Sequence, residues 1–257
     1  MGESKLNILN NAEEKIALFN RIGVHYEAVY HYIVRRRAET GGIRNDDYWN
    51  DLVDDITAGL ISFDMQRMMG KDKYLAEGND SWAAKLSSAL HSLKTKLLSL
   101  YPCSLQTVDF GNADIEAAIV TAFDVLSEPA TGLNRRNTEH SFPVGASKIL
   151  HFVIPDLFII VDSNARRVLE KEHSVHLNTP DGSSYLEAMG WYQQELNAWA
   201  TLNCDPECKE LVKLDKSWEK FNGARPTPLP RILDKCTFVD KYFQSVIHSS
   251  ASFGATR

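Results

Sequence analysis

The sequence predicts an all-α protein, because its apolar residues recur at helical spacing. Three segments repeat apolar side chains every three or four residues, which places them on one face of an α-helix. These segments are defined by Leu52, Ile56, Leu60 and Phe63, by Leu86, Leu90, Leu93 and Leu97, and by Ile115, Ile119, Ala122 and Leu126. Hydrophobic residues make up 44% of the 257 positions, which is enough for a folded core.

Four further helices are expected over residues 12–22, 24–39, 183–202 and 229–247. The proline-rich stretch 225–230 precedes the last of them and is the most linker-like part of the chain. No internal repeat or low-complexity tract is present. We therefore expect residues 1–257 to form one helical domain, either as a single body or as two lobes that share a core.

Composition also limits the cellular setting. No stretch approaches the roughly 20 apolar residues of a membrane helix, because Pro155 and Asp156 interrupt the longest apolar run. The first residues, Met1–Lys5, lack the apolar core of a secretory signal. We expect a cytoplasmic protein with no membrane partner.

The four cysteines do not form a metal-binding pattern. Cys204 and Cys208 are loosely paired, whereas Cys103 and Cys236 are isolated. Structural zinc and iron–sulfur sites draw closely spaced ligands from two places in a chain. We therefore expect neither a metal nor a cofactor.

The formal net charge of -6 argues against a protein that coats nucleic acid, because phosphate affinity comes from clustered lysine and arginine. Short arginine clusters nevertheless occur at 35–37, 135–136 and 166–167. They allow a basic face on an acidic body. Each cluster is also consistent with an ordinary solvated helix face.

Residues 142–164 contain the most informative pattern. The segment Phe142-Pro143-Val144-Gly145-Ala146-Ser147-Lys148 predicts a turn at Gly145 followed by a lysine, and it leads into an apolar run from Ile149 to Ile160. Pro155 should end the first helix of this run, so Leu157–Val161 should form a second buried segment. Asp162 would then emerge from the core at the start of a new helix. Aspartate at that position commonly caps the helix, and capping is compatible with catalysis because the helix dipole keeps the carboxylate ionised.

This segment resembles the helix-hairpin-helix DNA glycosylase superfamily, in which a Leu-Pro-Gly-Val-Gly-x-Lys hairpin precedes a Val-Asp-Thr segment with the catalytic aspartate. Pro143 and Lys148 fall in register with the hairpin, and Ile160-Val161-Asp162-Ser163 matches the second segment. Only Gly145 remains of the glycine pair, and the interval from Lys148 to Asp162 is shorter than usual. Residues 59–66 resemble a helix of the archaeal 8-oxoguanine glycosylase branch. The general likeness extends to bacterial antiphage glycosylases that remove glucosylated hydroxymethylcytosine.

The resemblance implies a helix-hairpin-helix element at about 131–172 and two helical lobes around a central cleft. It implies a monomer that binds double-stranded DNA, flips a modified or damaged base out of the duplex, and cleaves its N-glycosidic bond. Asp162 would be the catalytic carboxylate. Lys148 would either attack C1′ or contact phosphate, and we favour hydrolysis with Lys148 assisting binding.

The same resemblance and the local composition suggest further site residues. The expected DNA contacts are Gly145, Ser147, Arg135, Arg136, Ser163, Asn164 and Arg166, and the expected base pocket is formed by Phe63, Gln66, Trp49 and Phe142. For each aromatic residue, a place in the core is the alternative. Two other functions remain open at this stage: a non-catalytic helix-hairpin-helix module that binds DNA phosphates, and a helical interaction protein with no role on DNA.

Overall fold

The computed structural model describes residues 8–63, 81–134, 141–173 and 181–240, and within these ranges all regular structure is helical. The all-α prediction is therefore confirmed. The elements are α1 (Ala12–Ile22), α2 (Val24–Thr40), η1 (Gly42–Arg44), α3 (Tyr48–Ser62), α5 (Trp82–Leu100), α6 (Ala113–Ser127), η3 (Pro129–Thr131), α7 (Pro143–Val153), α8 (Ser163–His173), α9 (Gly182–Leu202), α10 (Lys209–Lys213) and α11 (Ser217–Lys220). A last helix begins at residue 229 and is described to residue 240, so the predicted end at 247 lies outside the described residues.

Side-chain caps explain where three of these helices begin. Ser81 accepts a hydrogen bond from Ala84 N at 3.1 Å, and Asn112 accepts one from Asp114 N at 3.0 Å. Asp181 accepts one from Ser184 N at 2.8 Å. Each oxygen satisfies an amide that has no partner within its own helix. Local sequence therefore sets the start of α5, α6 and α9.

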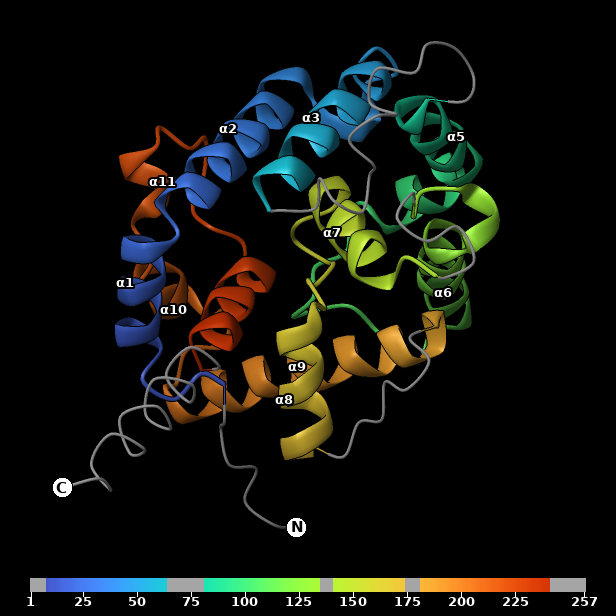
Figure 1. Cartoon of the computed structure of the whole chain (residues 1–257). Helices are drawn as coiled ribbons and strands as arrows, with labels where there is room; N and C mark the ends of the chain where they lie inside the picture. Colours follow the sequence, from blue (N-terminus) through green and yellow to red (C-terminus); the bar gives the residue numbers. More distant parts are fainter. Residues whose placement is uncertain (1–7, 64–80, 135–140, 174–180, 241–257) are drawn as a thin grey trace, which may run out of the picture.

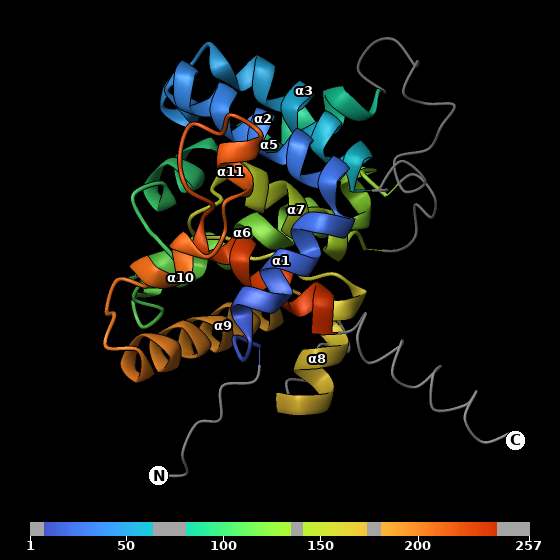
Figure 2. The ribbon, with the colours of Figure 1, turned by 90° about the vertical axis from the view of Figure 1, so that its left-hand side faces the viewer.

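Helix α7 lies at the centre of the molecule (Figure 1). Its residues 145–153 are all buried, and it packs against α3 and α6. Helix α6 also packs against α5 and α9, and α9 runs along the bottom of the molecule in both Figure 1 and Figure 2. A central helix without an exposed face must be apolar, which accounts for the long apolar run in the sequence.

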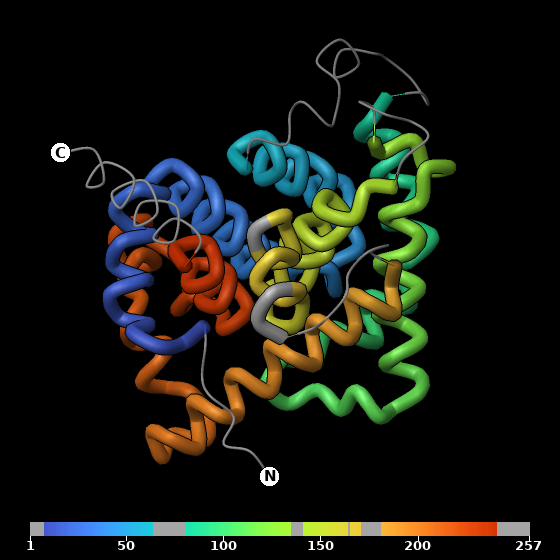
Figure 3. Tube along the Cα trace, turned by 60° about the horizontal axis from the view of Figure 1, so that its bottom comes forward, coloured from blue at the N-terminus to red at the C-terminus, as the bar shows by residue number. Residues whose placement is uncertain are grey.

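The two ends of the described chain lie side by side. In Figure 3 the C-terminal helix, in red, lies beside the N-terminal helices, in blue. Lys15 Nζ is 2.6 Å from Asp240 Oδ1, and the rings of Phe19 and Phe238 meet edge to face at 5.4 Å. The chain ends therefore form one side of the molecule, and α5 and α6 form another. The predicted two-lobe division around a cleft stays a prediction.

The segment after α7 behaves largely as predicted. Helix α7 ends at Val153, two residues before Pro155, and residues 157–160 are buried without regular structure. Asp162 follows directly, and α8 begins at Ser163.

The prediction of a turn at Gly145 is wrong. Helix α7 already begins at Pro143, so Gly145 lies in its first turn. The ring of Phe142 lies against Gly145 so closely that a Cβ atom there would overlap it. The glycine is thus explained by packing within a helix, and residues 135–140 of the predicted helix-hairpin-helix element lie outside the described residues.

Candidate functional site

Asp162 and Lys148, the two predicted catalytic residues, line the same cavity. Its volume is about 90 Å³. The lining residues come from α1, α2, the end of α3, α7, the segment before α8 and the C-terminal helix, and they are Phe19, Tyr26, Phe63, Lys148, Ile160, Asp162, Arg231, Asp234 and Phe238. The cavity therefore forms where the chain ends meet the central helix.

Asp162 both caps a helix and lines this cavity. Its Oδ1 accepts a hydrogen bond from Ala165 N at 3.0 Å, and its carbonyl oxygen accepts one from Arg166 N at 3.0 Å. Asp162 comes two residues after Ile160, which is 2% exposed, so it follows directly on a buried segment of the chain. The capping role predicted for Asp162 is confirmed, whereas its catalytic role stays a prediction.

Lys148 extends from α7 into the same cavity and is buried. Its Nζ lies 3.5 Å from the carbonyl oxygen of Phe63 and 5.2 Å from the centroid of the Phe63 ring. A carbonyl dipole and the face of an aromatic ring both attract a cation. These two contacts offset part of the cost of burying a charged amine.

Asp234 is a second carboxyl group in the cavity, and the sequence analysis missed it. Arg231 donates a hydrogen bond to the Asp234 carboxyl group. The charges of Asp162 and Lys148 also shift the pKa of Asp234. Burial raises the pKa of Asp234, Arg231 lowers it and Asp162 raises it, so that the pKa comes to about 6. The cavity thus contains one carboxyl group that changes protonation near neutral pH.

The spacing of charged residues in the last helix could have identified Arg231 and Asp234 from the sequence. The helix from residue 229 is largely apolar, yet Arg231, Asp234 and Lys235 occur at positions i, i+3 and i+4. That spacing places three charges on one face of a buried helix, where each needs a partner. Such a face indicates an internal charged site.

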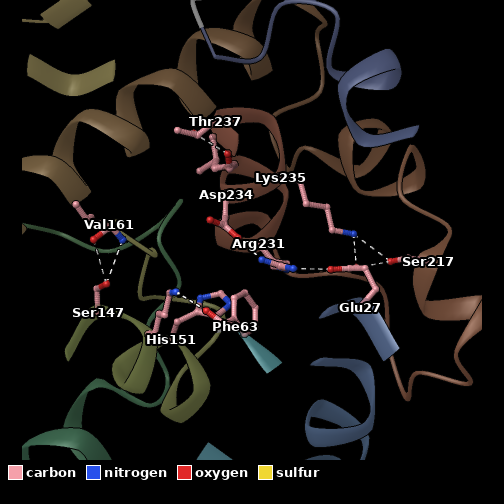
Figure 4. A network of polar contacts seen from close by, with 12 residues as sticks. Glu27, Phe63, Ser147, His151, Val161, Ser217, Arg231, Asp234, Lys235 and Thr237 are labelled. Atoms are coloured by element: carbon pink, nitrogen blue, oxygen red, sulfur yellow. Dashed lines mark hydrogen bonds and ion pairs between the residues drawn. The ribbon is translucent and has the colours of Figure 1, made fainter. Parts of the chain in front are cut away.

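The partners of this charged face come from the other end of the chain. Glu27 Oε1 is 2.6 Å from Arg231 Nη2, and Glu27 Oε2 is 2.5 Å from Lys235 Nζ. Lys235 Nζ is also 2.5 Å from Asp215 Oδ2. Figure 4 shows Glu27 between Arg231 and Lys235, with Arg231 continuing to Asp234. This buried ion network fixes Arg231, which in turn orients Asp234 at the cavity.

Aromatic rings form the rest of the cavity wall. The rings of Tyr26 and Phe63 stack at 5.4 Å with an interplanar angle of 26°. The Arg231 guanidinium carbon lies 5.0 Å from the ring centroids of both Phe19 and Phe63. The cavity thus has flat aromatic walls with charged groups at one side, a combination typical of ligand pockets.

Two residues predicted for the base pocket, Trp49 and Phe142, do not line this cavity. Trp49 is 2% exposed, and its indole Nε1 donates to Ile43 O at 3.0 Å. Phe142 is 1% exposed and lies against Gly145. Both belong to the core, because their apolar rings are held by close packing. Phe63 does line the cavity, and Gln66 lies outside the described residues.

Two of the predicted DNA contacts are buried. The Ser147 hydroxyl donates to Val144 O at 3.0 Å and accepts from Val161 N at 3.1 Å. It therefore joins α7 to the segment before α8 (Figure 4). Gly145 is buried under Phe142. Burial argues against direct contact of either residue with a DNA backbone in this structure, and both contacts stay predictions.

The other predicted DNA contacts have mixed outcomes. Ser163 is exposed, and Arg166 Nε is 2.7 Å from Glu170 Oε1. Ser163 and Arg166 line a second cavity of about 100 Å³, which Asp162 also borders. Arg135, Arg136 and the side chain of Asn164 lie outside the described residues.

The arginine cluster at 35–37 does not form a basic face. Arg36 pairs with Asp51 at 2.9 Å and with Asp55 at 2.8 Å. Arg37 is 7% exposed and donates to Phe152 O at 3.4 Å. Both guanidinium groups are therefore occupied by partners within the protein. Since Arg37 is buried, it does not belong to a solvated helix face either.

Within the described residues there is neither a candidate metal site nor a candidate membrane-spanning helix. No group of three or more histidine, cysteine, aspartate or glutamate side chains is arranged there to hold a metal ion, and the four cysteines are free thiols. Within the same ranges, no helix combines the length and the apolar character needed to cross a membrane.

Comparison with known proteins gave no relative: no family model, curated protein or solved structure matches this chain.

Proposed function

We propose that this protein is a DNA glycosylase that hydrolyses the N-glycosidic bond of a modified or damaged base flipped out of duplex DNA. The observation that carries the proposal is the convergence of Lys148, Asp162 and Asp234 on one cavity with aromatic walls. Two of these residues were expected from the resemblance. The third comes from a distant part of the chain and adds a group that can exchange a proton.

The charges in the cavity match those that develop during this reaction. As the N-glycosidic bond breaks, positive charge accumulates on the deoxyribose, and a carboxylate beside it lowers the energy of that state. Asp162 supplies this charge and accepts a proton from the attacking water. The water oxygen forms the new bond to C1′, and the electron pair of the broken bond goes to the base nitrogen.

Asp234 is suited to supply the proton that the departing base needs. A pKa of about 6 leaves a useful fraction of this carboxyl group protonated near neutral pH. Lys148 remains a cation beside Phe63 and offsets the negative charge of the two carboxyl groups. In this arrangement Lys148 binds and orients, and water is the nucleophile.

The volume of the cavity bears on the substrate. About 90 Å³ is less than the roughly 150 Å³ of a protein cavity that holds benzene. Side chains at the wall must therefore move before any base can enter. A glucosylated cytosine requires a larger opening than a damaged base without a sugar, so both substrate classes belong in the assay.

The test compares Asp162→Asn with a matched change at a second capping aspartate. Asp181→Asn removes the same charge from the cap of α9, and Asp181 does not line the cavity. On duplexes with oxidised, alkylated or glucosylated bases, we expect Asp162→Asn to release base at least about 100-fold more slowly than the wild type. Asp181→Asn should keep wild-type activity, and the two variants should melt at similar temperatures.

Other outcomes would change the proposal. Near-native turnover of Asp162→Asn would make Asp162 a helix cap only. DNA binding without base release on any substrate would instead indicate a non-catalytic DNA-binding module. If the protein fails to bind DNA at about 50 mM salt, where phosphate contacts are strongest, an interaction protein with no DNA role becomes the better description.

A further inference from the structure

A surface groove between α6 and α9 lies apart from the candidate active site. It has a volume of about 440 Å³. Apolar side chains of Phe110, Leu186 and Trp191 line it together with the carboxylates of Glu116 and Glu187, and Gly190 is also part of the lining. None of these residues borders the cavity that contains Asp162. The groove therefore needs an explanation of its own.

Gly190 is unusual among the helical glycines of the described structure. A Cβ at Gly59 would lie 2.5 Å from the Phe152 ring, and a Cβ at Gly182 would lie 2.5 Å from Val120 O, so packing requires glycine at both positions. Among the described residues, a Cβ at Gly190 would meet nothing within 4 Å. Glycine in the middle of a helix costs about 1 kcal/mol relative to alanine. At Gly190 no close contact within the described structure requires glycine, so packing does not explain this cost. The missing side chain keeps the groove open.

The charged residues of the groove indicate what it could bind. Within the described residues, neither Glu116 nor Glu187 forms an ion pair or a side-chain hydrogen bond, and both are exposed. Two unpaired carboxylates beside an indole ring and a leucine match a long cationic side chain, which places its charge near the carboxylates and its apolar stem on the ring. The same carboxylates repel phosphate, so the groove disfavours nucleic acid.

We propose that this groove docks a basic segment of a partner protein, with an arginine or lysine side chain over Gly190. The Trp191 ring holds the stem of that side chain, and Glu116 and Glu187 hold its charge. Apolar residues beside the cation pack on Phe110 and Leu186. This surface is independent of the proposed glycosylase activity, because it shares no residue with that site.

The experiment uses the full chain without DNA and follows the Trp191 indole signal in ¹H–¹⁵N spectra, assigned with Trp191→Phe. The probe is a blocked hexapeptide of alternating leucine and arginine, and its matched control alternates leucine and glutamate. We expect the basic peptide to shift the Trp191 signal saturably and the acidic peptide to leave it in place. Raising the salt from about 50 to 300 mM should weaken binding, since exposed charges are screened.

Variants then separate the groove from general surface charge. Gly190→Leu fills the groove and should weaken binding at least about 10-fold. Glu116→Gln and Glu187→Gln should each weaken it about 2- to 5-fold, as expected for exposed ion pairs. Glu219→Gln, which removes an exposed carboxylate on α11, should leave binding unchanged. Melting curves should confirm that Gly190→Leu is folded, because its Cβ meets no atom of the described chain within 4 Å.

Four results would overturn the proposal. The Trp191 signal could fail to respond to the basic peptide, or Gly190→Leu could bind it as well as the wild type does. Equal weakening by Glu219→Gln and Glu187→Gln would show attraction to the acidic surface as a whole. Concentration-dependent dimers that disappear in Gly190→Leu would make a second copy of this chain the occupant instead.

Discussion

At the scale of single residues, the surroundings of Lys148 bear on how a glycosidic bond would be broken. A lysine that attacks C1′ must lose its proton, which requires burial away from groups that stabilise the cation. Lys148 is buried, but its Nζ faces the carbonyl oxygen and the ring of Phe63. These groups stabilise the ammonium form and oppose its use as a nucleophile.

We therefore predict that borohydride present during turnover traps no covalent adduct with DNA. The product strand should break only after treatment with alkali, which reports an abasic site left by water. Lys148→Ala should weaken substrate binding more than it slows base release. A strong adduct in the wild type that disappears in Lys148→Ala would contradict this prediction and make Lys148 the nucleophile.

Asp234 predicts a specific pH dependence. Its pKa in the folded protein is about 6, raised from 3.8 mainly by burial. If the protonated form serves the departing base, base release should fall as the pH rises through 6. Asp234→Asn cannot ionise, so its residual activity should lack this decline. The measurement is single-turnover base release from about pH 5 to pH 8.

The same pKa shift affects stability, and its sign can be checked independently of activity. A raised pKa means that the folded protein holds the proton more tightly than the unfolded chain does. The stabilisation is complete below about pH 4 and is lost as the pH rises through 6. The stability of Asp234→Asn relative to the wild type should therefore increase from pH 4 to pH 7, by at most about 3 kcal/mol. A constant difference would show that the Asp234 pKa is not raised.

At the scale of elements, the approach of α3 to α7 depends on one glycine. A Cβ at Gly59 would lie 2.5 Å from Phe152 Cζ, and Phe152 contacts the cavity residue Phe63 edge to face at 5.7 Å. An added methyl group would push α3 away from α7 and displace the Phe63 wall. The site therefore depends on how closely these two helices pack.

We predict that Gly59→Ala destabilises the protein by about 1–3 kcal/mol through overpacking. Gly190→Ala is the matched control, because it makes the same substitution in a helix where a Cβ meets no neighbour within the part of the chain that the structure describes. It should be neutral or stabilising by up to about 1 kcal/mol. Urea denaturation of both variants measures the difference, and equal effects would contradict the packing argument.

At the scale of the whole molecule, the buried ion network joins the two ends of the chain. Burial alone would raise the pKa of Glu27, but Arg231, His31 and Lys235 lower it well below its usual value. Glu27, Arg231 and Lys235 are all fully buried. Charges removed from water in this way are tolerated only while each keeps its partners.

We predict that Glu27→Ala destabilises the protein by about 3–5 kcal/mol, because it leaves Arg231 and Lys235 without their shared carboxylate. Lys213→Ala breaks the exposed pair with Glu210 and should cost less than about 1 kcal/mol. Since the lowered pKa of Glu27 stabilises the fold only above about pH 4.5, the gap between the wild type and Glu27→Ala should narrow as the solution is acidified below that value. A small effect at neutral pH would show that the network does not hold the chain ends together.

The positions of most helices and the place of Asp162 at a helix start follow from local sequence. Helical spacing predicted α3, α5 and α6, and α1 occupies the predicted residues 12–22. Asp162 was expected at a helix start after a buried segment, and it caps α8 there. These features depend on neighbours within a few residues, and the sequence displays such neighbours directly.

Which side chains share the site depends on contacts between segments far apart in the chain. Arg231 and Asp234 reach the cavity from the C-terminal helix, and Glu27 holds Arg231 from α2. Trp49 and Ser147, expected in the pocket and at the DNA, are instead buried with internal partners. Whether an aromatic ring or a hydroxyl lies in the core or at a site depends on segments far away in the chain, and helical periodicity carries no information about which distant segments will pack against it.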